Sequence, residues 1–528
     1  MKKRVLCFGL TMNILFLCLC GRLFSLSVLP KEASLQQGTR VKEIATRRGY
    51  IYDRNLVPIS TSTQTHIVCI KPTTLALKHL SNNKEDKETL VQLTKGQLVI
   101  KKTDNPANYE NCEDIKTLPL IDNRSTPLLT HIIGYTDTSG SGVCGIEKYY
   151  NDFLKKSGGN LEIAYSADAN GRMLTNETAE VRDNNYYSKG GVVLTIDIKL
   201  QEILENALIN GNIQKGAGVI LDTKTNEILA CASMPDYDIN NISADLNNDN
   251  LPFINRAFSA FPVGSVFKVV TAAASLENNI SPTDYECNGE VTFSGNTFHC
   301  SKTEGHGKIN FNLALAKSCN PYFIELGVKA GAEKIIKISK DFRLGHSIDF
   351  GNSYMTDAGV LPSVDEFKSN ADTGNFAFGQ GRFTATPIQI ATIFSCIGNG
   401  GYYIKPTLIK GTTDKNGILN ENENTEREKI LKDSTCNTIK NALELTVTDG
   451  TGSMAKSDFY TCCSKTATAQ SGQYDKNGNE IKFCWFAGFF PKENPQYTIC
   501  ILKEQGSSGG SDCGPVFKEI AENILFDF

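Results

Sequence analysis

The pattern of hydrophobic and polar positions begins with one long apolar run, at residues 5–21, which carries no charged residue. Its length is near the lower end of the roughly 17 to 25 residues that span a bilayer. Three basic residues at positions 2–4 come before it, and they predict a cytoplasmic N-terminus and an exported body. We therefore expect a tail at residues 1–4 and a single-pass membrane anchor at residues 5–24. A cleaved signal peptide is the alternative, but no A-x-A-like site follows the run.

After this run the chain divides into two parts with different patterns. Residues 25–190 are polar and mixed, with short apolar stretches typical of strands and turns, and we expect a separate domain there. Residues 191–528 begin with a strand pattern that leads into an amphipathic helix. Leu200, Leu204 and Leu208 fall on one face of that helix.

The second part also contains two hairpin patterns. The first, at residues 216–234, has apolar runs around a Thr-Lys-Thr-Asn turn, and the second closes the chain at residues 484–504. Pro515 opens the last segment, where we expect a terminal helix. Strands, a long helical middle, further strands and a final helix predict an antiparallel sheet flanked by helices, which is an α+β fold.

A serine and a lysine lie three residues apart where a long apolar helix pattern begins, in "FPVGSVFKVVTAAASLE" at residues 261–277. Residues i and i+3 share one face of a helix, so the Ser265 hydroxyl and the Lys268 amine can meet. Serine is a weak nucleophile without an adjacent base, so the pair is a candidate activated serine. The same spacing occurs at Ser81 and Ser453 without a comparable helix, so the spacing alone is a weak signal.

Charge and cysteine usage narrow the possible functions. The chain has 54 basic and 58 acidic residues and a net charge of -4, so we expect no nucleic-acid partner. Its 17 cysteines show no repeating interval, and we expect one disulfide, between Cys287 and Cys300. A zinc site there with His299 and His306 is the weaker interpretation, because the spacing matches no standard ligand pattern. No H-E-x-x-H motif occurs, so we expect a metal-free mechanism without a cofactor.

Two more short motifs follow the S-x-x-K pair. Ser318 and Asn320 form an S-x-N element, and Lys465, Thr466 and Ala467 form a Lys-Thr-small element. Each tripeptide is common by itself, but the three occur here in one order. S-x-x-K, S-D-N and K-T-G are the signature of penicillin-binding proteins and class A β-lactamases.

The chain resembles the class B penicillin-binding proteins, which are monofunctional peptidoglycan D,D-transpeptidases, over nearly its whole length. "RRGYIYDRN" and "GVCGIEKYYNDFL" are similar to elements of the family's N-terminal pedestal. The stretches similar to its catalytic domain are, in order, "LTIDIKLQ", "NRAFSAFPVGSVFK", "FAFGQGRFTATPIQIA" and "GGYYIKPTL". The resemblance implies an elongated pedestal at residues 25–190 and a transpeptidase domain with a serine β-lactamase-like fold at residues 191–528, on the extracytoplasmic side of the cell membrane.

The resemblance also implies a role for each motif residue. Ser265 would attack the penultimate D-Ala carbonyl of a stem peptide, release the terminal D-Ala and form an acyl-enzyme. Lys268 would be the base, Ser318 would relay a proton to the leaving amine, and Asn320 would hold a backbone amide of the substrate. The acyl group would pass to an amine on a neighbouring strand, and β-lactams would acylate the same serine.

Residues around the third motif would bind the substrate. Lys465 would place positive charge near the substrate carboxylate, which the Thr466 and Thr468 hydroxyls would bind. The backbone N–H groups of Ser265 and Thr468 would form the oxyanion hole. Gln380, in "FAFGQG", either lines the substrate or belongs to a structural turn, and both interpretations stay open.

The sequence departs from the family pattern at two positions. Ala467 replaces the usual glycine of K-T-G. If its methyl group faces the packed side of the sheet, activity should survive with an altered fit, whereas a methyl group in the cleft should lower β-lactam affinity. Leu56 replaces a usual glycine of the pedestal element, where only a turn is concerned.

Several alternatives to a transpeptidase remain. A serine β-lactamase or a D,D-carboxypeptidase would share the serine and lysine, and a catalytically weakened scaffold or a β-lactam sensor would be a different class of protein. We expect no sensor, because residues 1–4 leave no room for a cytoplasmic signalling domain. The resemblance implies a membrane glycosyltransferase partner in a cell-wall synthesis complex, and it leaves open a role in elongation, division or sporulation.

Overall fold

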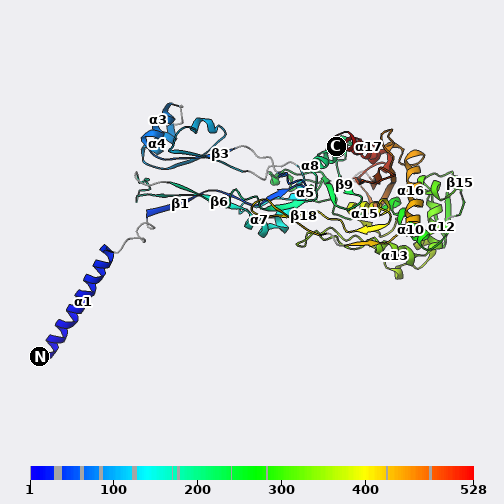
Figure 1. Ribbon diagram of the computed structural model, residues 1–528. Helices are drawn as coiled ribbons and strands as arrows, with labels where there is room; N and C mark the ends of the chain where they lie inside the picture. Colours follow the sequence, from blue (N-terminus) through cyan, green and yellow to red (C-terminus); the bar gives the residue numbers. More distant parts are fainter. Residues whose placement is uncertain are drawn as a thin grey trace. The chain divides into compact units, whose positions relative to one another are not determined.

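The computed structural model describes most of the chain, which forms two compact units (Figure 1). The described residues are 2–28, 38–59, 65–82, 87–121, 128–168, 170–174, 179–239, 241–280, 283–423, 426–474 and 478–527. Unit 1 comprises Met1–Arg48, Ser62–Asp122 and Gly158–Tyr187, and unit 2 comprises Gly49–Thr61, Asn123–Ser157 and Ser188–Phe528. Residues 49–61, 123–157 and 188–190 of the expected domain at residues 25–190 thus belong to the second unit.

The first helix, α1 (Lys2–Val28), includes the apolar run of the sequence and is dark blue in Figure 1. Its large apolar side chains are exposed, with Phe8 at 69% and Leu17 at 70%. Among the residues that the structure describes, no helix is both long enough and apolar enough to cross a membrane.

Unit 1 contains two three-stranded sheets, in the orders β1-β6-β7 and β4-β3-β5. Their strands are β1 (Thr39–Arg47), β3 (His66–Ile70), β4 (Val99–Thr103), β5 (Ile115–Pro119), β6 (Gly159–Ser166) and β7 (Glu180–Asn184). The helical segments are α3 (Thr74–Asn82), α4 (Lys87–Thr94) and η1 (Pro106–Tyr109). A small core that includes Val68, Leu80 and Leu93 forms between the second sheet and these helices.

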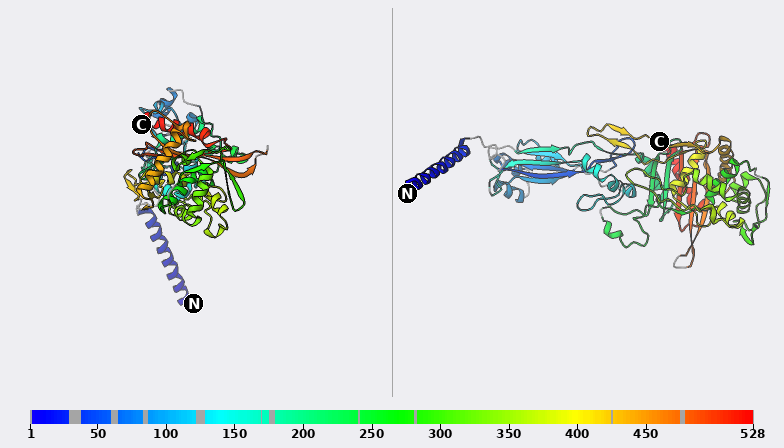
Figure 2. Two further views of the ribbon diagram at one scale, coloured as in Figure 1. Left: turned by 90° about the vertical axis from the view of Figure 1, so that its right-hand side faces the viewer. Right: turned by 90° about the horizontal axis from the view of Figure 1, so that it is seen from below.

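Unit 2 is built on an antiparallel five-stranded sheet in the order β10-β9-β23-β22-β21. The strands are β9 (Gly216–Asp222), β10 (Ile228–Met234), β21 (Cys463–Tyr474), β22 (Glu480–Phe490) and β23 (Tyr497–Glu504). The far ends of β21 and β22, orange in Figure 2, project from the helices around them. β21 is the edge strand of this sheet among the residues that the structure describes, and an edge strand is the kind of strand to which an extended peptide can add.

Helices cover both faces of this sheet. Adjacent residues of a strand point to opposite faces, and Phe486 belongs to the core shared with α8 (Ile198–Asn210) and α17 (Gly509–Asp527). Trp485, one residue earlier, belongs to the larger core on the other face, where α15 (Pro387–Gly398) and α16 (Asp433–Thr448) contact the sheet. Burial of both faces explains why these strands are continuously apolar, and the predicted α+β architecture is confirmed.

The remaining elements of unit 2 surround this sheet. Its other helical segments are α5 (Thr130–Ile133), α6 (Gly145–Tyr149), α7 (Asn151–Ser157), α9 (Ile242–Asp245), η2 (Gly264–Phe267), α10 (Lys268–Glu277), α11 (Phe311–Ala316), α12 (Asn320–Ala330), α13 (Ala332–Asp341), η3 (Val364–Glu366), α14 (Asn370–Ala377) and η4 (Ser453–Ala455). Its other strands are β2 (Tyr50–Tyr52), β8 (Gly191–Leu194), β11 (Phe261–Pro262), β12 (Tyr285–Cys287), β13 (Glu290–Phe293), β14 (Asn296–His299), β15 (Gly307–Ile309), β16 (Thr384–Ala385), β17 (Tyr402–Ile404), β18 (Ile409–Thr413), β19 (Leu419–Glu421) and β20 (Arg427–Lys429).

The structure confirms both predicted hairpins, β9–β10 and β22–β23, but it corrects the start of the terminal helix. α17 begins at Gly509, and Pro515 lies inside the helix. The carboxylate of Asp512 accepts hydrogen bonds from the backbone N–H groups of Ser507 and Ser508. Because this carboxylate caps the chain ahead of the proline, the helix starts earlier than the proline signal indicates.

Leu56 lies in the left-handed region of backbone space, with φ of 62°. This region favours glycine, which explains why a glycine would suit the turn better. The turn is held by Asp53, whose Oδ1 accepts from the backbone N–H groups of Asn55 and Val57, both at 2.8 Å. The effect of having Leu56 in place of glycine is therefore limited to backbone strain within this turn.

Candidate active site

Ser265 lies on the short helical segment η2, which continues directly into α10. Gly264 precedes it with φ of 62°, and a Cβ there would lie 3.0 Å from the side chain of Ala469 on β21. The Gly264 N–H donates to the carbonyl oxygen of Gly379 at 3.0 Å. Glycine at position 264 thus lets the serine segment approach both the edge strand and the loop after α14.

Lys268 is fully buried at the start of α10 and contacts the S-x-N motif. Its Nζ donates to the Ser318 carbonyl oxygen at 2.7 Å, to the Ser318 Oγ at 3.1 Å and to Asn320 Oδ1 at 2.7 Å. Burial lowers the pKa of Lys268 to about 7. A substantial fraction of this amine is therefore neutral near neutral pH, as a general base requires.

Ser318 and Asn320 connect α11 to α12, and each contacts Lys268. Ser318 has φ of 57°, a left-handed conformation that costs free energy in a residue other than glycine. Asn320 opens α12, and its Nδ2 donates to the His299 carbonyl oxygen at 3.0 Å. The two polar side chains of the predicted S-x-N motif therefore meet the lysine of the predicted S-x-x-K motif.

Lys465 lies on the edge strand β21 and is also fully buried. Its Nζ donates to the Thr466 carbonyl oxygen at 2.8 Å. Burial lowers the pKa of Lys465 well below its usual value, and the charge of Lys268 lowers it further. A positive charge on Lys268 therefore favours the neutral form of the Lys465 amine.

The two threonines of the third motif have partners that the sequence did not indicate. The Thr466 Oγ1 lies 2.6 Å from the Thr451 Oγ1, and the Thr468 Oγ1 accepts from the Gly509 N–H at 3.3 Å. Thr468 is exposed, whereas Thr466 is buried. Of the two hydroxyls expected to bind a substrate carboxylate, that of Thr468 is the more accessible.

Ala467 has its methyl group in the packed interior. It pairs with Trp485 on the neighbouring strand β22. It is 3% exposed and belongs to the larger core of unit 2. Of the two alternatives drawn from the sequence, the structure supports a methyl group on the packed side. The backbone of Ala467 also lies against Gly509, where an added Cβ would come within 2.4 Å of the Ala467 carbonyl oxygen.

Gln380 belongs to the loop that contacts the serine segment. It follows Gly379, which has φ of 84°, and its own backbone N–H donates to the Asn375 carbonyl oxygen at 3.1 Å. A Cβ at Gly379 would lie 2.0 Å from the Gly264 carbonyl oxygen, so this position requires glycine. The close contact of Gly379 with Gly264 thus places the half-buried Gln380 beside the serine segment. Whether Gln380 lines the substrate or only belongs to the turn stays a prediction.

The predicted disulfide between Cys287 and Cys300 is wrong, because both residues are free thiols in the structure. Cys300 instead has its Sγ 3.4 Å from the His306 Nδ1. A hydrogen bond with Cys319 lowers the pKa of the Cys300 thiol. Cys319, which no cysteine spacing singled out, joins this group because it comes from the start of α12, next to the S-x-N side chains.

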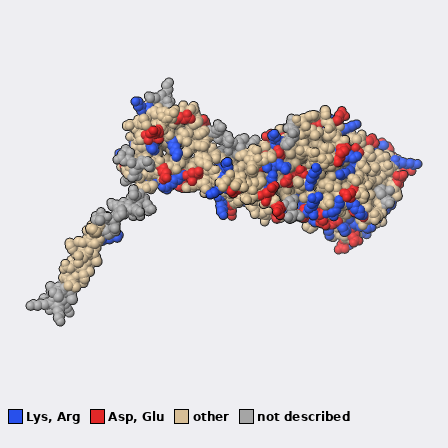
Figure 3. Space-filling model, viewed as in Figure 1, with Lys and Arg blue, Asp and Glu red and all other residues tan. Residues whose placement is uncertain are grey.

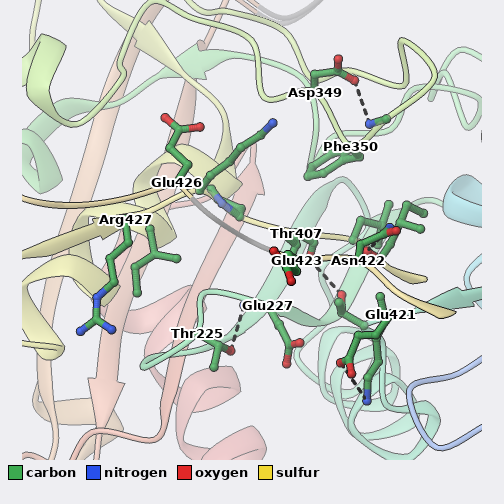
Figure 4. Close-up of a pocket in the computed structure, with 18 of the residues that line it drawn as sticks. Thr225, Glu227, Asp349, Phe350, Thr407, Glu421, Asn422, Glu423, Glu426 and Arg427 are labelled. Atoms are coloured by element: carbon green, nitrogen blue, oxygen red, sulfur yellow. Dashed lines mark hydrogen bonds and ion pairs between the residues drawn. The ribbon is translucent and has the colours of Figure 1, made fainter. Parts of the chain in front are cut away.

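A separate cavity of about 620 Å³ lies elsewhere in unit 2 (Figure 4). Its lining carries both charge signs, including Lys224, Glu227, Lys410 and Glu421. None of the residues of the three motifs lines it. The surface of unit 2 seen in Figure 3 likewise shows basic and acidic side chains interspersed, without a large patch of one sign.

Comparison with known proteins bears directly on this arrangement. The family model described as penicillin binding protein transpeptidase domain matches residues 216–522. Stage V sporulation protein D of Bacillus subtilis (strain 168) is 29% identical over 519 residues, which cover 91% of this chain and 77% of that protein. Peptidoglycan D,D-transpeptidase MrdA of Haemophilus influenzae is 28% identical over 433 residues, covering 74% of this chain and 64% of that protein.

Solved structures show the same fold. Penicillin-binding protein 3 of Mycobacterium tuberculosis, solved in complex with aztreonam, superposes with a TM-score of 0.66 at 22% sequence identity. The match covers 92% of this chain and 96% of that one. Because the family model spans more than half of the sequence and contains all three motifs, the chain belongs to the penicillin-binding protein transpeptidase family.

Proposed function

We propose that this protein crosslinks peptidoglycan by D,D-transpeptidation through an acyl-enzyme on Ser265. The observation that carries the proposal is the buried Lys268 amine. It lies three residues after the serine, where η2 continues into α10, and it contacts both side chains of the S-x-N motif. Relatives named peptidoglycan D,D-transpeptidases and a solved neighbour in complex with a β-lactam support the same chemistry.

In the first step, the Ser265 Oγ attacks the penultimate D-Ala carbonyl carbon of a stem peptide. Neutral Lys268 accepts the hydroxyl proton, and the backbone N–H groups of Ser265 and Thr468 stabilise the oxyanion, each contributing roughly 3 kcal/mol. The C–N bond to the terminal D-Ala then breaks. The proton reaches the leaving amine through Ser318, so D-Ala departs with a neutral amino group.

Substrate binding depends on the edge strand. The stem peptide adds to β21 as an extended strand, and its terminal carboxylate lies near Lys465, Thr466 and Thr468. The low pKa of Lys465 rises when this anion arrives, because an opposite charge favours the protonated amine. Charge on Lys465 therefore develops together with substrate binding.

In the second step, an amine from a neighbouring strand attacks the acyl-enzyme. Lys268 again accepts a proton, this time from the attacking amine, and it passes this proton to the Ser265 oxygen as the ester bond breaks. The new amide bond is the crosslink. β-Lactams enter the same path at the first step, and their acyl-enzyme persists because the leaving group stays attached.

We also propose that α1 anchors the chain in the cell membrane, with both units on the extracytoplasmic side. Its exposed apolar side chains and the basic residues at positions 2–4 support this orientation. Such an anchor would place the protein beside a membrane glycosyltransferase, as a partner in a cell-wall synthesis complex.

The test of the proposed reaction is intact mass spectrometry of the full chain after incubation with a penicillin. We expect one covalently bound penicillin on the parent and none on Ser265→Ala. Ser453→Ala is the matched control, since Ser453 has the same S-x-x-K spacing, and it should acylate like the parent. A folded parent without an adduct would contradict the proposal, and rapid release of the adduct by water would favour a β-lactamase.

A further inference from the structure

Three thiols and one imidazole converge beside the S-x-N motif, outside the groups that carry out acyl transfer. Cys287, Cys300, His306 and Cys319 each offer one ligand atom, and these four atoms lie within 4.8 Å of one another. The three cysteines are buried, with exposures of 1%, 5% and 0%. His299, which the sequence suggested as a neighbour, is an exposed residue paired with Glu290 instead.

We propose that these four side chains bind one zinc ion, which holds the S-x-N segment in position. Zinc bound to sulfur at about 2.3 Å and to nitrogen at about 2.0 Å in a tetrahedron places the two ligand atoms about 3.5 Å apart. The Cys300 Sγ and the His306 Nδ1 are 3.4 Å apart. Three thiolates and one imidazole form a closed structural zinc set, and they are too soft a set for magnesium or calcium.

The local backbone is shaped to bring these ligands together. Cys287 ends β12, while Cys300 and His306 lie at the two ends of the loop between β14 and β15. Gly305 has φ of 79°, and a Cβ there would lie 2.0 Å from the Cys287 carbonyl oxygen. Gly289 has φ of 96°, and a Cβ there would lie 2.0 Å from the Thr303 carbonyl oxygen. Only glycine at both positions permits this close approach of the two segments.

A metal accounts for the whole cluster, whereas a disulfide does not. A disulfide would bond two of the three thiols and would not explain why the third thiol and the His306 imidazole lie beside them. Zinc binding uses all four ligands, requires no oxidant, and releases three thiol protons to solvent. Four protein ligands leave no open position on the metal, so the ion would be structural and the acyl transfer would stay metal-free.

The position of Cys319 connects this site to the proposed chemistry. Its two neighbours in sequence, Ser318 and Asn320, are the residues whose side chains contact the Lys268 Nζ. A metal bond at Cys319 would restrain both contacts, including the left-handed backbone of Ser318, which needs support from its surroundings. This positioning role rests on the proposed function, whereas the existence of the metal site does not.

The metal site is tested by zinc stoichiometry in the detergent-solubilised full chain, purified under reducing conditions, loaded with zinc chloride and desalted. We expect about one zinc per chain in the parent and in the control Cys396→Ser, which alters a buried thiol elsewhere. Cys287→Ser and Cys300→Ser should each lose most of the zinc, and so should His306→Ala, which disturbs the core less. A parent that retains no zinc, or one whose intact mass shows a disulfide among the three cysteines under these conditions, would overturn the site.

The positioning role is tested by the rate of penicillin acylation before and after a chelator removes the zinc from the parent. We expect acylation to slow at least about tenfold and to recover when zinc is restored, because small displacements of catalytic groups are costly. An unchanged rate in the folded, zinc-free protein would overturn the positioning role. If the zinc-loaded parent is never acylated, the proposed function fails while the stoichiometry still decides the metal site.

Discussion

Among single side chains, the amine of Lys268 is the group on which the proposed chemistry depends most. It is fully buried, and Ser318 and Asn320 supply its hydrogen-bond acceptors. A lysine exposed to water would be almost wholly charged at neutral pH and could not accept a proton. Desolvation therefore lets this lysine be neutral at neutral pH, which its proposed role as a general base requires.

This burial predicts the pH dependence of acylation. Because the pKa of Lys268 falls to about 7, the neutral amine increases as the pH rises through 7, and the acylation rate should rise with it and level off above about 8. The measurement is the second-order rate constant for penicillin acylation between about pH 5.5 and 8.5. A flat profile over this range would contradict the assignment. In Lys268→Arg, the new arginine cannot lose its proton, so the rate constant for penicillin acylation should fall at least about a hundredfold.

Ala467 allows a prediction about the departure from K-T-G. Its methyl group is 3% exposed in the core, so Ala467→Gly should leave transpeptidase turnover within about tenfold of the parent. The free energy of unfolding should fall by about 1 kcal/mol, from the lost methyl contact and the greater backbone freedom of glycine. Turnover and denaturant unfolding measure the two effects. A much larger gain in turnover would show that the methyl group obstructs the cleft.

At the level of secondary-structure elements, the site depends on the contact between the serine segment η2 and the loop after α14. Two glycines with positive φ, Gly264 and Gly379, meet there through one backbone hydrogen bond of 3.0 Å. η2 also lies against the edge strand β21. The helix with the serine and lysine is therefore aligned by close backbone contacts on two sides.

Gly379→Ala tests this contact. The new Cβ would lie 2.0 Å from the Gly264 carbonyl oxygen, in a backbone conformation that costs alanine about 1–2 kcal/mol even without a clash. We expect a lower melting temperature and acylation of Ser265 at least about tenfold slower. Gly140→Ala is the matched control, because Gly140 also has positive φ but has open space around its Cβ position. Equal acylation by the two variants would show that the loop contact does not align the serine.

For the molecule as a whole, each of the two units has its own hydrophobic core. The three motifs all lie in unit 2, so every residue assigned to the proposed acyl transfer belongs to that unit. The net charge of -4 and the mixed charges in Figure 3 give no reason to expect a nucleic-acid partner.

The proposed anchor gives a prediction for the intact protein. We expect the full chain to stay with the membrane pellet after extraction at alkaline pH, because its apolar helix is held by the bilayer and not by charge. Replacing residues 1–24 with a cleavable signal should release the protein to the soluble fraction while penicillin acylation is retained. Release of the parent by alkaline extraction would contradict the anchor.

Much of the fold and part of the site could be predicted from the sequence. The β9–β10 and β22–β23 hairpins follow from apolar runs around polar turns, and α8 follows from its helical periodicity. The three motifs were found from their order along the chain. The start of α17 was missed because the Asp512 carboxylate caps a helix that the proline signal placed later.

The sequence by itself determined which residues could carry chemistry, because spacing within one helix or one strand depends only on near neighbours. Only the tertiary structure decided that Lys268 is buried against Ser318 and Asn320, and that the methyl group of Ala467 is packed away. It also decided that Cys319 joins Cys300 in a cluster with no disulfide. Burial and convergence of this kind arise from segments far apart in the chain, and local periodicity carries no information about them.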